Sequence, residues 1–250
     1  MNEHAVIRDK DGRILSNIYC RVFNELWSQG GRYYRGDVLS IKNRDTNDRL
    51  RITINGGAVA EVDYSNLHFR IIAAEYKAIP EHRMPQDIYT EVLKDKNNKV
   101  DRRIVKDTIN IMFNCDSKKQ AIGAINSSLN SMTDEEKNTR TIHKAKDVIE
   151  LVENTYPDFK EFFCKEGGFG GSLQNLDARL ITNVLDRMIE EGIVCLPVHD
   201  SCIVLQEHMN TLIGVMSDEF RQTFDWDGEV PLGIKYFDEC GNLVDKQIVS

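Results

Sequence analysis

The sequence predicts an α+β protein in which a small antiparallel sheet is interrupted by a helical insertion. Two pairs of apolar segments flank tight turns and indicate hairpins, one at residues 51–64 around Asn55-Gly56-Gly57 and one at residues 193–205 around His199-Asp200. Between the hairpins, apolar residues recur mostly at helical spacing. The sheet is therefore expected to combine segments that lie far apart in the chain.

The remaining elements follow from periodicity, caps and breakers. Residues 1–29 are predicted to hold an N-terminal helix, because apolar residues within 14–28 have helical spacing and the run ends at Gly30-Gly31. The other expected elements, in chain order, are an extended piece at 32–35, a loop at 36–50, strands at 51–54 and 58–64, helices at 66–76, 87–94, 100–114, 117–129, 134–153 and 157–165, a flexible break at 167–171, a helix at 172–191, strands at 193–198 and 202–205, a helix at 206–224 and a strand at 230–237.

Composition bounds the class of protein. The 250 residues are 41% hydrophobic and 29% charged, which is typical of a globular domain, and no apolar run approaches the ~20 residues of a membrane span. Six scattered cysteines without a CxxC pair favour neither a zinc site nor a disulfide framework, so a cytoplasmic location is expected. The net charge of -8 argues against wrapping nucleic acid by bulk attraction.

The candidate chemistry depends on two aspartates at strand ends. Asp63 ends the first hairpin, and Asp200 lies in the turn of the second. Two carboxylates can hold two divalent ions that stabilise the attacking and leaving oxygens of a phosphoryl displacement, and Mg²⁺ suits such a site. Arg102 and Lys106 lie one helical turn apart, on the polar stripe that continues through Asn110 and Asn114, where they could hold a triphosphate.

Each of these signals also has an ordinary structural interpretation. Asp63 alone is more simply a turn residue, and Arg102 and Lys106 alone are more simply a solvated helix face. Asp177, within the long helix at 172–191, is expected to be solvated as well. The joint order of these residues is much harder to obtain by chance than any one of the signals alone.

The joint order resembles the palm and fingers of family A DNA polymerases, with partial similarity to single-subunit RNA polymerases. Residues 63–70 (DYSNLHFR) are similar to motif A of that family, Arg102-x3-Lys106 to motif B, and residues 198–201 (VHDS) to motif C. The collinear resemblance covers about residues 30–250. It implies a polymerase-like palm at 30–76 and 172–250 with a small antiparallel sheet, and reduced helical fingers at 77–171. Such a protein would be minimal and thumbless, of a phage or mobile-element type.

The resemblance also implies residue roles. Asp63 and Asp200, with the Tyr64 carbonyl, would bind two Mg²⁺ ions, for which Mn²⁺ could substitute. Lys106 would bind phosphate and protonate the departing pyrophosphate. The other implied roles are nucleotide binding by Arg102, Asn110, Asn114 and His68, and primer or template binding by Arg32, Gln174 and His199.

The leading hypothesis is therefore a template-directed, DNA polymerase-like nucleotidyltransferase, in which a primer 3′-hydroxyl attacks the α-phosphate of a dNTP. Its partners would be DNA primer-template and dNTPs, without a membrane; either a protein partner supplies the duplex grip, or synthesis is short. Asn110 and Asn114 depart from the family, which has aromatic residues there, and His68 replaces a glutamate that blocks a ribose 2′-hydroxyl. Two alternatives stay open: an RNA polymerase or primase-like activity, and a degenerate palm that binds nucleic acid or a replication partner without catalysis.

Overall fold

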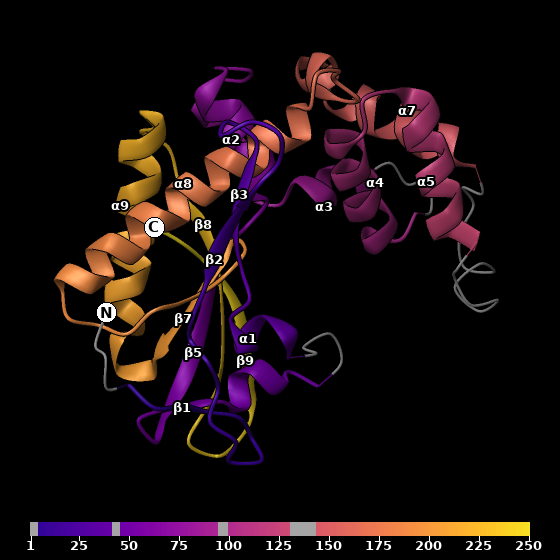
Figure 1. Cartoon of the computed structure of the whole chain (residues 1–250). Coiled ribbons are helices and arrows are strands. Elements are labelled where there is room, and N and C mark those ends of the chain that lie inside the picture. Colours follow the sequence, from indigo (N-terminus) through magenta and orange to yellow (C-terminus); the bar gives the residue numbers. More distant parts are fainter. Residues whose placement is uncertain (1–4, 42–45, 95–99, 131–143) are drawn as a thin grey trace.

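The computed structural model describes residues 5–41, 46–94, 100–130 and 144–250, and it has the α+β fold with an antiparallel sheet that the sequence predicts. Within these ranges, seven strands form the main sheet, and β5 lies between β7 on one side and β8 on the other (Figure 1). The strands of the main sheet are β1 (Ile7–Arg8), β4 (Thr53–Ile54), β5 (Gly57–Tyr64), β6 (Leu196–Val198), β7 (Ser201–Leu205), β8 (Pro231–Phe237) and β9 (Leu243–Val249).

Two tight turns set the register of this sheet. Asn55 and Gly56 both have positive φ (51° and 83°), as a two-residue hairpin between β4 and β5 requires. His199, with φ 57°, opens the turn between β6 and β7. The resulting pairing places Asp63 of β5 opposite Ser201 on one neighbouring strand and opposite Gly233 on the other.

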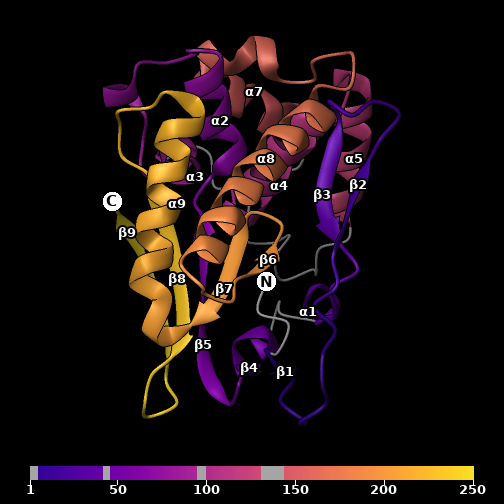
Figure 2. The same cartoon turned by 60° about the vertical axis from the view of Figure 1, so that its left-hand side comes forward.

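Two long helices cover one face of the sheet. Helices α8 (Phe169–Glu190) and α9 (Met209–Phe224) lie side by side across β5, β7 and β8 (Figure 2). Because side chains alternate along a strand, Val62 and Tyr64 of β5 point toward these helices and are fully or almost fully buried. The Tyr64 hydroxyl donates to the Met216 carbonyl of α9 at 2.6 Å, so Asp63 must face the opposite side.

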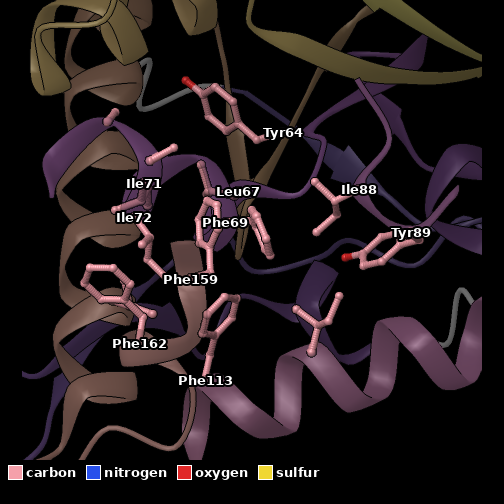
Figure 3. Close-up of a cluster of buried hydrophobic side chains, with 14 of the residues drawn as sticks. Tyr64, Leu67, Phe69, Ile71, Ile72, Ile88, Tyr89, Phe113, Phe159 and Phe162 are labelled. Carbon is pink, nitrogen blue, oxygen red and sulfur yellow. The ribbon is translucent and has the colours of Figure 1, made fainter. Parts of the chain in front are cut away.

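An aromatic cluster joins the sheet to the helical part of the chain. Phe69 of α2 (Leu67–Glu75) packs against Phe113 and Phe159, with ring centroids 5.8 and 3.8 Å away (Figure 3). This packing fixes the position of α4, which carries the predicted basic stripe, relative to the end of β5. The helices of this part are α3 (Ile88–Leu93), α4 (Arg102–Asn114), α5 (Lys118–Asn130) and α7 (Ala145–Thr155), followed by a 3₁₀ segment at Pro157–Phe162.

The predicted N-terminal helix is wrong. Residues Cys20–Phe23 form β2, which pairs with β3 (Gly30–Tyr34) in a separate two-stranded sheet. Four of the apolar residues that suggest a helix, Ile14, Ile18, Val22 and Leu26, lie four positions apart, and this spacing fits one face of a strand as well as one face of a helix. These four are 48–73% exposed, whereas Leu15 between them is buried.

Other local predictions also need correction. The expected break at 167–171 is instead the start of α8, with Gly168 at its N-cap and φ 74°. The expected loop at 36–50 contains α1 (Asp37–Ser40) and the start of a 3₁₀ turn, Asp48–Arg51, while β9 was not predicted at all. Part of the predicted helix at 134–153 lies outside the described residues. Within them, α7 (Ala145–Thr155) forms its C-terminal part.

Candidate functional site

The two predicted carboxylates meet at one end of the central strands. Asp63 is the penultimate residue of β5, and Asp200 lies in the turn between β6 and β7. The backbone N–H of Tyr64 donates to the carbonyl of Asp200 at 3.1 Å, so the main chains of the two acidic segments are directly joined. Both aspartates line a single cavity of about 740 Å³, which lies between the sheet and α4.

Negative charge is crowded at this point of the sheet. The pKa of Asp63 is raised to about 6, chiefly by burial and then by the nearby charges of Asp200 and Glu61, while Lys235 and Lys106 act in the opposite direction. Glu61 lies two residues before Asp63 on the same face of β5, and it accepts hydrogen bonds from Arg49 and Ser201. A carboxylate held in this environment is stabilised by any cation that binds beside it.

Gly233 provides space for the Asp63 carboxylate. This glycine faces Asp63 on β8, and a Cβ at position 233 would lie 2.2 Å from Oδ1 of Asp63. Such a contact is far shorter than any van der Waals distance, so a side chain there would displace the carboxylate. This constraint cannot be predicted from the sequence, because a single glycine in a strand has several explanations.

Helix α4 forms the basic wall of the cavity. Arg102 donates to Oδ2 of Asp87 through Nη2 (3.0 Å) and Nε (3.3 Å), and its guanidinium lies 4.9 Å from the centre of the Tyr89 ring. Asp87 also caps α3 by accepting from the backbone N–H of Tyr89 at 2.9 Å. Lys106 lines the cavity one turn further along α4 and is exposed.

A buried ionic cluster forms the opposite wall. Asp177 of α8 is completely buried, and its Oδ2 contacts the Arg32 guanidinium and lies 2.9 Å from Nε2 of His68. The prediction that Asp177 is solvated is therefore wrong. Its spacing was the missed signal: Asp177 lies four residues after Leu173 and three before Leu180, on the apolar face of the helix. A carboxylate on such a face needs a buried cation.

The remaining predicted residues also line the cavity. Gln174 of α8 donates to Oδ1 of Asn114 at 3.2 Å, and Asn114 in turn donates to the Asn110 carbonyl at 2.8 Å. The His199 ring lies 6.3 Å from the ring of Tyr34 on β3. The Asn114 side chain thus joins α4 to α8 at the cavity wall.

The fold gathers every predicted site residue around the same cavity. The residues that line it from this set are Arg32, Asp63, Tyr64, His68, Arg102, Lys106, Asn110, Asn114, Gln174, His199 and Asp200. The C-terminal strands add side chains that the sequence did not indicate. Lys235 of β8 forms an ion pair with Asp245 of β9 at 3.3 Å, and Gln247 donates to the Ser65 hydroxyl at 3.0 Å. Asp245 and Gln247 lie on β9, which the sequence does not predict, whereas Lys235 lies on the predicted strand at 230–237, where nothing in the sequence marks it as a site residue.

The donor set fits a hard divalent cation. Asp63 and Asp200 supply carboxylate oxygens, which Mg²⁺ prefers. Among the described residues, no group of three or more His, Cys, Asp or Glu side chains is arranged to hold a metal. Two carboxylates nevertheless suffice for Mg²⁺, because this ion usually keeps several waters and phosphate oxygens among its ligands. The raised pKa of Asp63 fits a metal site that lacks part of its ligands until phosphate oxygens bind.

The chain is thus an α+β protein with a two-carboxylate, cation-lined cavity. No protein-family model matches it, and no curated protein matches it. Among solved structures, it is similar to one described as the POL domain of Pol1 from M. smegmatis in complex with DNA primer-template and dNTP, with a TM-score of 0.49 and 12% identity. The match covers 90% of this chain and 47% of that one, so this chain spans about half the length of the structure it matches.

No helix among the described residues combines the length and the apolar character that crossing a bilayer requires.

Proposed function

We propose that this protein is a template-directed nucleotidyltransferase of the DNA polymerase type, acting on a primer 3′-hydroxyl and a dNTP. The observation that carries the proposal is that Asp63 and Asp200, from separate hairpins, line one cavity together with Arg102 and Lys106 of α4. Carboxylates on one wall and cations on the other match the two halves of a nucleotide-metal complex. The resemblance of motifs A, B and C supports the same assignment.

In this proposal, the cavity residues have different roles. Asp63, Asp200 and the Tyr64 carbonyl would hold two Mg²⁺ ions, and bound Mg²⁺ would stabilise the charge on the attacking and leaving oxygens. Arg102 exchanges its contact with Asp87 for the triphosphate. Lys106 is exposed to the cavity, so it can bind the β- and γ-phosphates and give a proton to the pyrophosphate.

The other cavity residues are assigned to binding the nucleic acid and the incoming nucleotide. Gln174 and His199 both line the cavity, where they can contact the template and the primer terminus. Arg32 and His68 are both fixed by Asp177, so they present preset donors at the side wall. Asn110 and Asn114 offer hydrogen bonds to the incoming nucleotide. His68 stands where the family resemblance places the residue that blocks a ribose 2′-hydroxyl. Its contacts with the sugar of the incoming nucleotide would therefore decide between deoxyribose and ribose.

The test is primer extension with Mg²⁺ on a DNA primer-template, comparing the wild type with Asp63→Ala and Asp200→Ala. Both variants are expected to lose extension by at least about 10³-fold, because each removes a ligand that cannot be replaced from nearby. Asp227→Ala, at a surface turn, is the matched control and should extend at the wild-type rate. Equal extension by all four proteins would end the proposal.

The sugar preference is tested with the same proteins. Ribonucleotides supplied with and without a primer separate a DNA polymerase from an RNA polymerase or primase-like enzyme. We expect extension of a DNA primer with dNTPs to exceed both ribonucleotide reactions. The opposite order would transfer the assignment to the RNA-synthesising alternative while retaining the same metal-binding aspartates.

A non-catalytic palm is the second candidate, and one observation favours it. The Asn114 side chain is engaged with the Asn110 carbonyl and with Gln174, and neither Asn110 nor Asn114 provides an aromatic ring on which a base can stack. In this alternative, the chain binds nucleic acid or a replication partner without turnover. Calorimetry that finds no Mg²⁺-dependent nucleotide binding by a folded protein would support it over the first proposal.

A further inference from the structure

The hairpin of β2 and β3 exposes a tryptophan at its tip. Trp27 is 82% exposed, and Leu26 beside it is 58% exposed, although both are residues that proteins usually bury. The proposed reaction does not use either residue. Exposed apolar groups that cluster on a monomer commonly mark a binding surface.

The tip of this hairpin is fixed to the wall of the cavity. Asn175 of α8 donates to the carbonyls of Trp27 (3.0 Å) and Gly30 (3.2 Å). Asn175 directly follows Gln174, which lines the cavity and bonds to Asn114 at the end of α4. Trp27 therefore lies just outside the end of the cavity that these amide side chains form.

The chemistry around Trp27 suits a nucleobase. The ring of Phe23 meets Trp27 edge-on, with centroids 4.7 Å apart, and the guanidinium of Arg21 lies 4.9 Å from the centre of the Phe23 ring. Residues 20–35 contain three arginines and one glutamate, a net charge of +2 in a chain whose total is -8. Aromatic rings beside arginines form the sites on which proteins stack unpaired bases.

We propose that Trp27, with Phe23 and Arg21, is a stacking platform for unpaired bases of the template strand as it passes the end of the cavity. The identity of that strand rests on the proposed function, whereas the chemistry of the platform does not. Helix α4 presents Asn110 and Asn114 to this end of the cavity, so the hairpin supplies the ring surface that α4 lacks. DNA and RNA single strands share the recognised feature, the face of a base.

Intrinsic fluorescence tests the platform without turnover. The chain has two tryptophans, and Trp226 is only 2% exposed, so a ligand-dependent change in emission reports mainly Trp27. Oligothymidylate and oligouridylate, added in EDTA, are expected to quench the emission of the wild type to saturation. The Asp200→Ala variant should be quenched equally, and a blunt duplex should quench much less. Trp27→Phe should abolish the signal.

Affinity measurements test the same surface independently. On a primer-template with a single-stranded template overhang, Trp27→Ala is expected to weaken binding by about fivefold or more, and Trp27→Phe should restore most of the loss. Binding to a blunt duplex should be unchanged. Leu26→Ala is the matched control, because Leu26 is an exposed apolar residue at the same tip without a ring.

Three results would overturn the platform: no quenching by either single strand, equal overhang affinity for the wild type and Trp27→Ala, or self-association in sedimentation that Trp27→Ala abolishes. The last result would assign the surface to a protein contact between copies. Failure of the stacking platform is distinguishable from failure of the proposed function. Quenching without primer extension supports the platform and removes the polymerase, whereas extension without quenching does the reverse.

Discussion

Asp63 is held by the fold in an environment that disfavours its charge. Its pKa rises from 3.8 to about 6, first because of burial and then because of Asp200. Since the folded state binds the proton more tightly than the unfolded chain, the free energy of unfolding should decrease as pH rises from about 4 to about 6. The carboxylate therefore costs stability at neutral pH in the absence of a metal ion.

Asp63→Asn should stabilise the metal-free protein at pH 7 by about 1–3 kcal/mol and remove most of this pH dependence. Urea unfolding in EDTA between pH 4.5 and 7.5 measures both effects. Asp227→Asn, at a surface position, should keep the wild-type slope. A wild-type protein whose stability increases through this interval would contradict the assignment of the slope to Asp63.

Asp177 makes the opposite contribution, because its charge is compensated. The carboxylate is fully buried between Arg32 and His68, so its removal leaves a mostly buried guanidinium without a partner. Asp177→Leu should lower the free energy of unfolding by about 2–4 kcal/mol. Urea denaturation measures the loss.

A second variant separates the loss of the ion pair from poor packing of the introduced leucine. In Arg32→Met/Asp177→Leu, the uncompensated charge is gone, and the double variant is expected to recover much of the stability lost by Asp177→Leu alone. Purely additive effects of the two substitutions would contradict the ionic explanation. Primer extension by the double variant should stay impaired, because Arg32 lines the cavity.

The residues of the site differ in how far the sequence could reveal them. Asp63 and Asp200 are predictable as site candidates because Asp63 ends a strand and matches motif A, and Asp200 lies in a turn and matches motif C. The sequence-based expectation that Asp177 is solvated is wrong because its spacing with Leu173 and Leu180 places it on the buried face. The partners of Asp177 could not be predicted, since the contact with Arg32 joins residues 145 positions apart.

At the scale of elements, the contact between β5 and β8 determines where the Asp63 carboxylate can lie. Gly233→Ala would place a Cβ 2.2 Å from Oδ1 of Asp63, so the carboxylate would have to move from its present position. We expect Mg²⁺-dependent primer extension to fall at least about tenfold while the circular dichroism spectrum is retained. Gly214→Ala, on α9 with open space around it, should be tolerated.

An unchanged extension rate for Gly233→Ala would show that the carboxylate can act from another rotamer. The loss should appear mainly in kcat, with the KM for the nucleotide changing less, because α4 and its phosphate-binding residues are not displaced. A general loss of folding, seen as an earlier cooperative unfolding transition, would instead assign Gly233 to sheet stability.

Elements were predictable where one local signal determines them. Asn55-Gly56 determines the hairpin of β4 and β5 because both residues adopt positive φ. The sequence predicts a helix where β2 lies because a spacing of four residues fits both periodicities, and only the pairing of β2 with β3 decides between them. Strand β9 lacks a continuous apolar face, and its pairing with β8 is what makes it a strand.

At the scale of the whole molecule, the chain carries -8, and acidic and basic side chains line its cavity together. Arg32, Arg102, Lys106 and Lys235 lie there beside Asp63, Asp87, Asp200 and Asp245. Repulsion from the acidic surface should make nucleic-acid binding weak, and phosphate contacts of the basic side chains should make it dependent on salt.

Lys106→Ala tests this distribution. The slope of log K against log salt concentration for a primer-template should become shallower by about 1, because one phosphate contact is lost. Fluorescence anisotropy over a series of salt concentrations provides the measurement. Lys119→Ala, at an exposed position of α5 outside the cavity, should leave the slope unchanged; equal changes in both variants would argue for unspecific attraction.

The hydrogen bond from the Tyr64 amide to the Asp200 carbonyl makes the two acidic segments one mechanical unit. The spacing of Asp63 and Asp200 along the backbone is then a property of the main chain, and neighbouring side chains can vary without altering it. Strand β5 and the β6–β7 hairpin, transplanted together with their register, should carry that spacing into a different scaffold.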